Sequence, residues 1–257
     1  MGSDERREED EIFAKLPPGI ALSWGIVKQP RRGPKGELSI AKIVDAAIEI
    51  ADREGLSSLS MSKVAQALGF TTMSLYRYIK GKEELLVLMQ DAVCRIPIPP
   101  EDAGKSWRQE MREYFEAGVG VFRRHPWYGE TSFVHLPMTP GNLAAIDWLL
   151  RIMRNLPLTD TEKMSFMLLI ASYVRACGLA VIDSDRAERE GASPDAFIKD
   201  AHAAMFRLVS PDRFPYLSQV MMSGAYSEDV GDSELTGLDF GFERIMDSIE
   251  YYVQRKM

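Results

Sequence analysis

The sequence contains little of the chemistry that marks an enzyme or a metal protein. Its two cysteines, Cys94 and Cys177, lie far apart in helical patterns, which argues against a disulfide framework and a cysteine metal site. Its three histidines, His125, His135 and His202, include no pair at the spacing of metal ligands on a helix. Motifs for a serine nucleophile, a zinc protease and a phosphate-binding loop are missing as well. We therefore expect no catalytic residue, no metal and no cofactor.

Long apolar runs and strand patterns are equally scarce. The longest apolar run, residues 166–182, carries Ser172 and Arg175 in its middle, so we interpret it as a buried helix and expect no membrane partner. Residues 1–11 are acidic and contain no apolar segment, so we expect no secretion signal and a reducing, cytoplasmic location. Because no period-two alternation of useful length occurs, the pattern predicts an all-α fold.

The charge of the chain is unevenly distributed. The 257 residues carry a net charge of −7, which argues against a protein that coats nucleic acid with its whole surface. Residues 31–82 nevertheless contain nine basic and five acidic residues, a net charge of +4, which leaves −11 for the rest of the chain. This asymmetry indicates a local anion-binding module on an acidic body.

The helical patterns divide the chain into three parts. Residues 1–38 run from a charged start through Pro17-Pro18-Gly19 and Trp24 to a basic cluster, and we interpret them as a flexible N-terminal arm. The pattern of residues 39–95 predicts four short helices, and the prolines within 97–100 mark a domain boundary. Residues 101–257 form the second domain. Its helices are predicted over about 105–124, 142–155, 160–190, 193–208, 212–222 and 238–254.

Residues 39–88 show the arrangement of a helix-turn-helix motif, with Gly69 at the tight turn between the second and third helices. A small apolar core is expected from Val64, Ala65, Leu68, Leu75 and Ile79. When these residues face inward, Thr72, Met73 and Tyr76 lie together on the opposite side, at the helix end that enters a major groove. The hydroxyl groups of Thr72 and Tyr76 can bond base edges or phosphates, and Met73 can contact a thymine methyl group.

This segment resembles the DNA-binding domain of the tetracycline-repressor (TetR) family over about residues 39–90. The resemblance rests on three stretches that agree in order and spacing: Leu59–Ala65, Leu68–Phe70 and Ser74–Leu86. It implies a homodimeric, ligand-responsive transcription regulator, usually a repressor, that binds double-stranded operator DNA. It also implies that the second half of the chain is a helical ligand-binding and dimerisation domain.

The resemblance further implies which side chains contact DNA. The positions that face bases in the family fall on Ser62, Thr72, Met73 and Tyr76. The positions that contact phosphates fall on Ser60, Ser74, Arg77, Tyr78 and Lys82. Ser62 departs from the arginine that is common in relatives reading guanine, and a serine cannot make a bidentate guanine contact. We therefore expect an operator different from that of the tetracycline repressor itself.

A basic cluster, Arg31, Arg32 and Lys35, precedes the first helix of the motif on a Gly/Pro-rich segment. Such a segment can enter the adjacent minor groove and read its width. It can equally be a solvated linker that touches phosphates at most. The sequence leaves both interpretations open.

The second half is rich in aromatic residues and methionines, most of which we interpret as core. Some are predicted to line a pocket for a large apolar or aromatic effector, between the helices over 105–124 and 142–155 and the start of the next helix. These are Met111, Phe115, Trp148, Met164 and Met167. Arg175 joins them as a ligand candidate, because a guanidinium on so apolar a helix needs a partner. That partner is a ligand carboxylate or carbonyl, a nearby acid, or the other subunit.

Two helices are candidates for dimerisation, residues 160–183 and 238–254. The first is apolar nearly all round, and two such helices per subunit would form a four-helix bundle across a two-fold axis. The sequence thus predicts a dimeric, all-α repressor in which a small molecule changes the separation of two recognition helices and releases a palindromic operator. The alternative is a small-molecule-binding or protein-interaction module whose helix-turn-helix is structural, supported by Ser62 and the acidic charge. An α-helical enzyme ranks third.

Overall fold

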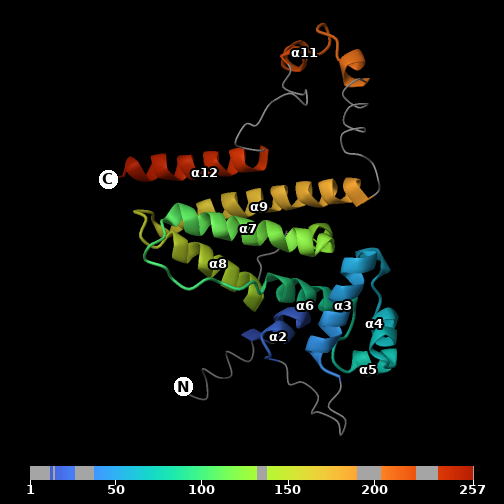
Figure 1. Ribbon diagram of the computed structural model, residues 1–257. Coiled ribbons are helices and arrows are strands. Elements are labelled where there is room, and N and C mark those ends of the chain that lie inside the picture. Colours follow the sequence, from blue (N-terminus) through green and yellow to red (C-terminus); the bar gives the residue numbers. More distant parts are fainter. Residues whose placement is uncertain are drawn as a thin grey trace.

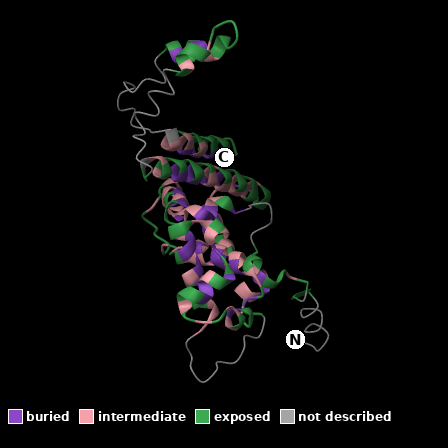
Figure 2. Ribbon diagram, turned by 90° about the vertical axis from the view of Figure 1, so that its right-hand side faces the viewer, coloured by how far each residue is buried: buried purple, intermediate pink, exposed green. Residues whose placement is uncertain are grey.

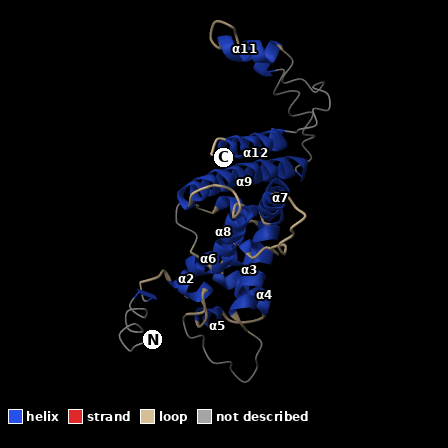
Figure 3. Ribbon diagram, turned by 90° about the vertical axis from the view of Figure 1, so that its left-hand side faces the viewer, coloured by secondary structure: helices blue, strands red, loops and turns tan. Residues whose placement is uncertain are grey.

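A computed structural model gives the fold of the chain. It describes residues 12–13, 15–26, 38–131, 138–189, 204–223 and 237–256. Within these ranges every regular element is a helix, so the predicted all-α class is confirmed (Figure 3). In chain order the elements are α2 (Pro18–Ser23), α3 (Ile40–Glu54), η1 (Leu56–Ser58), α4 (Met61–Leu68), α5 (Thr72–Tyr76), α6 (Lys82–Cys94), α7 (Trp107–Arg124), η2 (Pro126–Glu130), α8 (Pro140–Ile152), α9 (Asp160–Arg189), α11 (Pro215–Met222) and α12 (Gly237–Gln254).

Side-chain caps explain where the helices of the N-terminal domain begin. Ser39, Ser60 and Thr71 precede α3, α4 and α5, and each hydroxyl oxygen accepts a hydrogen bond from the backbone N–H three residues on, at 3.2–3.3 Å. Such a cap satisfies a backbone donor that the first turn leaves unpaired. Gly69 ends α4 in the left-handed region, at φ +72°, which glycine adopts without a Cβ clash.

The helices α3, α4 and α5 form one end of the molecule, and α6 connects them to the rest (Figure 1). One side of α6 packs against α3, and its C-terminal part packs against α8. The buried core runs without interruption through both domains, as the purple segments of Figure 2 show. The linker between the domains, residues 95–106, contains no helix, in agreement with its prolines.

The C-terminal domain stacks its helices in layers in the order α8, α7, α9 and α12 (Figure 1). Aromatic side chains fill the layer between α7, α9 and α12, where the Phe115 ring lies 5.9 Å from that of Tyr173 and 4.7 Å from that of Phe242. Ion pairs join α7 to α12 beside this aromatic layer, because Arg108 and Arg112 of α7 bond acidic residues of α12. α11 stands apart from these layers.

The prediction of a flexible arm over residues 1–38 is wrong for residues 15–26. Pro18–Ser23 form the helix α2, which packs against α6 and buries Gly19 and Ala21. The Pro-Pro-Gly sequence that suggests a turn instead starts this helix, because proline is accepted in a first helical turn. Gly19 then allows the α2 backbone to approach Val87 of α6 closely.

The helices predicted over 105–124, 142–155, 212–222 and 238–254 agree with α7, α8, α11 and α12 to within three residues at each end. Proline in the first turn moves the start of α8 to Pro140, and α11 starts at Pro215 for the same reason. Most of the helix predicted over 193–208 lies outside the described residues, and residues 204–208 are helical. Residues 224–236, between the helices predicted over 212–222 and 238–254, also lie outside them.

Candidate DNA-binding interface and ligand-binding domain

The recognition helix α5 is held by two fully buried side chains, Leu75 and Ile79. Its opposite side is open to solvent: Met73 is 74% exposed and Tyr76 is 39% exposed. Thr72 lies half-buried beside them at the first helical position. An exposed methionine of this extent has no role in the core of the monomer, so the structure leaves this side of α5 free to enter a major groove.

Ser60 and Ser62 of the preceding helix are also exposed, and Ser60 caps α4 with its hydroxyl oxygen. Ser74 shares a hydrogen bond of 2.9 Å with the hydroxyl group of Thr71. Its hydroxyl group therefore already has a local partner at the start of α5. α4 packs against α5 at one end of the molecule, as the order of α4, turn and α5 requires (Figure 1).

Arg77 is exposed, Tyr78 is half-buried, and Lys82 lies at the first position of α6. The Lys82 ammonium donates to the Leu56 carbonyl oxygen at 3.2 Å, a contact that the sequence pattern does not indicate. The Glu84 carboxylate accepts from the backbone N–H of Lys80 at 2.7 Å and fixes the turn after α5. Arg31, Arg32 and Lys35 lie outside the described residues.

Of the residues predicted to line a ligand pocket, Met111, Phe115 and Trp148 lie in one buried core, and the two aromatic rings make different ring contacts. Trp148 of α8 packs edge-on against Tyr114, with ring centroids 5.3 Å apart, whereas Phe115 faces α9 and α12. Adjacent residues of a helix point about 100° apart, so Tyr114 and Phe115 serve different layers. Met111 is fully buried and Met167 packs against the core. Met164 is 43% exposed, on the outer side of α9.

Arg175 reaches across from α9 to η2 and donates to the carbonyl oxygens of Gly129 and Thr131, at 3.0 Å each. These carbonyl groups are partners that the sequence pattern did not indicate. The adjoining Tyr128 hydroxyl group lies 3.2 Å from the Cys94 Sγ atom of α6. Four elements, α6, α7, η2 and α9, thus surround a polar cluster inside an otherwise apolar domain, which we define as Cys94, Tyr114, Tyr128 and Arg175.

Burial controls the ionisation of this polar cluster. Loss of solvent raises the pKa of the Cys94 thiol to about 11 and that of Tyr114 to about 12, and it also raises the pKa of Tyr128. At neutral pH these three groups are therefore uncharged hydrogen-bonding groups, and Arg175 carries the positive charge of the cluster. From the sequence, Tyr114 and Tyr128 belong to the aromatic residues of the second half, most of which are interpreted as core, and Cys94 has no assigned role. No sequence signal identifies these residues, because they come close to Arg175 only when four elements pack together.

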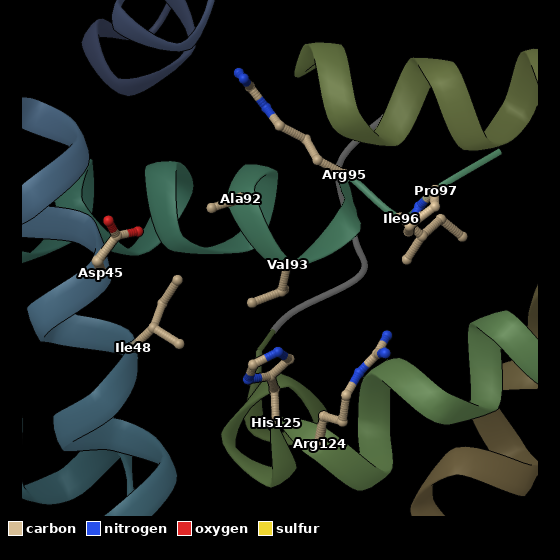
Figure 4. A pocket seen from close by; sticks show the side chains of 9 residues that line it. All are labelled: Asp45, Ile48, Ala92, Val93, Arg95, Ile96, Pro97, Arg124 and His125. Carbon is tan, nitrogen blue, oxygen red and sulfur yellow. The ribbon is translucent and has the colours of Figure 1, made fainter.

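The two domains also touch through Asp52 of α3. Its carboxylate contacts His125 Nδ1 at 2.9 Å and accepts from the Trp127 indole N–H at 2.7 Å. His125 follows the last residue of α7 and so caps that helix while holding α3. Clefts of 370 and 270 Å³ flank the contact on its two sides. In Figure 4 the larger cleft lies between Asp45 and Ile48 of α3, the end of α6, and Arg124 with His125.

The described residues contain no cluster of acidic, cysteine and histidine side chains able to hold a metal ion. α9 is long and apolar enough to cross a membrane by length and composition, and a third of its most apolar window is buried. The exposed residues of α9 include Met164, Leu168, Ser172, Ala176 and Leu179, three or four positions apart. This spacing places them on one face, opposite the buried Ile170 and Val174.

The fold and the exposed recognition helix define the class of the protein, a helix-turn-helix DNA-binding protein. The chain matches the family of bacterial regulatory proteins named after tetR over residues 43–89, and a tetracyclin repressor-like C-terminal domain over residues 99–252. The HTH-type transcriptional repressor DrrR1 of Streptomyces coeruleorubidus is 34% identical over 99% of this chain and 92% of its own length. The chain therefore belongs to the TetR family of transcription regulators.

Solved structures show the same fold. The TetR family protein ActR of Streptomyces coelicolor, in complex with actinorhodin, is 23% identical and superposes with a TM-score of 0.69 over 88% of this chain and all of that chain. BioQ in complex with its double-stranded DNA operator is 25% identical, with a TM-score of 0.50 over 60% of this chain and 93% of that chain. The shared architecture covers both the helix-turn-helix and the helical second domain.

Proposed function

We propose that the chain is a homodimeric, cytoplasmic repressor that an aromatic small molecule releases from a palindromic operator. The observation that carries the proposal is the exposure of Met73 and Tyr76 on a recognition helix whose other side is locked by Leu75 and Ile79. Family membership supports it, because a TetR-type regulator acts through this helix. DrrR1 is named a repressor, which supports the sign of the regulation.

Direct base contacts in this proposal come from Ser62, Thr72, Met73 and Tyr76. Phosphate contacts come from Ser60, Ser74, Arg77, Tyr78 and Lys82, with Arg31, Arg32 and Lys35 touching the flanking DNA. The described geometry supports the division, since the first group lies on and beside the open side of α5 and Lys82 starts the following helix. Without an arginine at position 62, the operator half-site is read mainly by hydroxyl and methionine contacts.

The homodimer is supported by the outer face of α9. An apolar face of this length, centred on Leu168 and Ser172, is costly to leave in water. The small side chains Ser172 and Ala176 in the middle of the face allow a second helix to approach closely. Pairing of α9 and α12 with their copies gives a four-helix bundle and places two recognition helices on successive turns of DNA.

We place the effector site at the polar cluster of Cys94, Tyr114, Tyr128 and Arg175, with Trp148 and Phe122 as aromatic walls. Trp148 packs on Tyr114, and Phe122 lies 5.1 Å from Tyr128 between ring centroids. Neutral hydroxyl groups and one guanidinium among aromatic rings fit a planar molecule that carries hydroxyl, carbonyl or carboxylate oxygens. The complex of ActR with actinorhodin supports a small-molecule ligand for this fold.

The operator is identified by selecting bound sequences from random DNA with the purified full-length protein. Tyr76→Ala should weaken binding to the selected palindrome by tenfold or more, because the side chain lies on the docking side of α5. Tyr216→Ala is the matched control, since Tyr216 is 83% exposed on α11, far from the motif. Equal binding by both variants would contradict the assigned docking side, and the absence of any selected sequence would favour a structural helix-turn-helix.

The effector class is tested with alizarin, a planar dihydroxyanthraquinone, against glucose 6-phosphate. Alizarin should raise the melting temperature and displace the operator, because it binds the folded state alone. Arg175→Gln and Tyr128→Phe should weaken both effects. Tyr173→Phe is the matched control, because its hydroxyl group bonds the Leu238 carbonyl oxygen on the α12 side of the domain. Response to the sugar phosphate alone would overturn the proposed ligand class.

A further inference from the structure

The N-terminal helix α2 is held at both of its ends by other parts of the chain. Near its start the backbone at Gly19 lies against α6, so that a Cβ atom added there would be 2.9 Å from the Val87 Cβ atom. Ala21, two residues further on, is 5% exposed. At its end Trp24 donates its indole N–H to the Met138 carbonyl oxygen at 2.7 Å. A segment of the N-terminal part of the chain therefore contacts the residue that leads into α8.

The start of α8 is attached to α6 from a second direction. The Gly141 backbone N–H donates to Asp91 Oδ1 at 2.7 Å, and the second carboxylate oxygen of Asp91 accepts from Arg95 at 2.6 and 3.1 Å. A Cβ atom on Gly141 would lie 2.4 Å from the Asp91 carbonyl oxygen, so the two helices approach at backbone distance. α2, α6 and the start of α8 thus form a three-way junction.

This junction links the two domains because α6 belongs to both of them. Its side toward α3 completes the core of the DNA-binding domain, and its C-terminal part carries Asp91 and Cys94 into the second domain. Because α2 packs on α6, a rotation of α8 that carries Met138 away from α6 would stretch the Trp24 hydrogen bond. The Trp24 hydrogen bond is solvent-exposed, so we expect its loss to weaken the junction without unfolding either domain.

We propose that Trp24 is a positioning residue that holds α8 against α6 through α2 and so stabilises the DNA-binding arrangement of the two domains. Its contact sets the operator affinity and the effector concentration at which the operator is released. The second part rests on the effector response proposed above. The first part does not, because operator affinity is measured without effector.

The effector-free experiment uses the full-length protein and its selected operator. Trp24→Phe keeps a ring and removes the N–H donor, and it should weaken operator binding two- to fivefold while hydrogen exchange of residues 138–143 becomes faster. Gly19→Ala pushes α2 away from Val87 and should have the same two effects by a different route. The salt dependence of operator binding should stay at the parent slope, because no phosphate contact is removed. Circular dichroism verifies the fold of each variant.

Two substitutions serve as matched controls. Trp107→Phe changes a tryptophan at the start of α7, and Gly120→Ala adds a methyl group where no atom lies within 4 Å. Both should bind the operator and exchange hydrogen at residues 138–143 like the parent. Parent-like operator affinity and exchange in folded Trp24→Phe and Gly19→Ala would overturn the proposal. A weaker operator affinity with a flatter salt slope would also overturn it, because it would assign these residues to phosphate binding.

The effector arm uses alizarin as the probe. If alizarin releases the parent from its operator, Trp24→Phe should be released at a two- to fivefold lower concentration. Release at the parent concentration would contradict the role of Trp24 in the response. If alizarin does not release the parent, the proposed effector class fails, and the effector-free measurements still decide whether Trp24 positions the domains.

Discussion

The contacts within the DNA-binding domain join residues that are close in the sequence, whereas those within the C-terminal domain join residues that are far apart. In residues 39–88 the hydroxyl groups of Ser39, Ser60 and Thr71 cap the starts of α3, α4 and α5, each accepting from the backbone N–H three residues on, and the core repeats at helical spacing. In the C-terminal domain, decisive contacts join residues more than a hundred positions apart, such as Arg112 with Asp239. The first domain therefore depends mainly on local interactions, and the second depends more on partners that are distant in the sequence.

The largest expected effect breaks the local core of the DNA-binding domain. Leu75 is fully buried, and Leu75→Ala should lower the free energy of unfolding by about 2–5 kcal/mol and abolish operator binding. Urea unfolding and DNA binding measure the two effects. Leu208→Ala is the control, because Leu208 is 72% exposed and its loss should change stability by less than about 0.5 kcal/mol. Equal stability of the two variants would refute the assigned core.

The next effect concerns a long-range contact between α6 and α8. Asp91 is 3% exposed and accepts hydrogen bonds from Arg95 and the Gly141 N–H, so Asp91→Ala should cost about 1.5–3 kcal/mol of unfolding free energy. Glu101→Ala is the matched control, because its pair with Arg154 is exposed and 3.7 Å long. Similar losses in both variants would show that burial does not distinguish these two carboxylates.

A specificity measurement sharpens the view of the recognition helix. Met73→Ala should relax the preference at one base pair by about 1–3 kcal/mol and leave stability unchanged, since Met73 packs on nothing in the monomer core. Lys82→Ala should instead weaken binding to all sequences and flatten the salt slope by about one. An unchanged slope would assign Lys82 to its Leu56 contact alone.

A smaller effect is expected where α12 attaches to α7. Arg112 bonds Asp239 at 2.6 Å, pairs with Glu243, and lies 4.3 Å from the centroid of the Phe242 ring. Arg112→Ala should lower unfolding free energy by about 1 kcal/mol, and less in high salt, because the network is partly solvated. Arg244→Ala, at a more exposed pair with Asp247, should change it less. A salt-independent loss would point to packing on Phe242 instead of charge.

The smallest effect is a pH dependence at the contact between α9 and α12. Hydrogen bonds from Lys256, Tyr252 and the Thr159 backbone lower the pKa of Glu162 to about 2 from an ordinary value of 4.5. The contact is therefore fully present above pH 4.5 and is lost as pH falls toward 2, because the folded state resists protonation of Glu162. A carboxyl NMR titration measures the value, and Glu162→Gln should remove this pH dependence of the last turn of α12. A Glu162 titration near 4.5 would contradict the contact.

The features that define the DNA-binding domain are local in the sequence. Capping hydroxyl groups, Gly69 in the left-handed region and the inward Leu75 and Ile79 are local features, so their positions fix the outward side of α5. The resemblance to the TetR family then indicated that this side of α5 contacts DNA. The match to the family model confirms that the chain belongs to that family. Local interactions of this kind act within a few residues, which is the range that a sequence pattern records.

Three features depend on packing between elements that are distant in the sequence: the position of α2, the contacts of Arg175 and the face of α9 that stays exposed. Pro17 and Pro18 fit a turn as well as a helix start, and the close approach of Gly19 to Val87 selects the helix. The ring contacts of the aromatic residues are also set by the fold, because Tyr114 packs on Trp148 of α8 and Phe115 packs on Phe242 of α12. Side-chain direction depends on which element lies opposite, and that information exists only once the chain has folded.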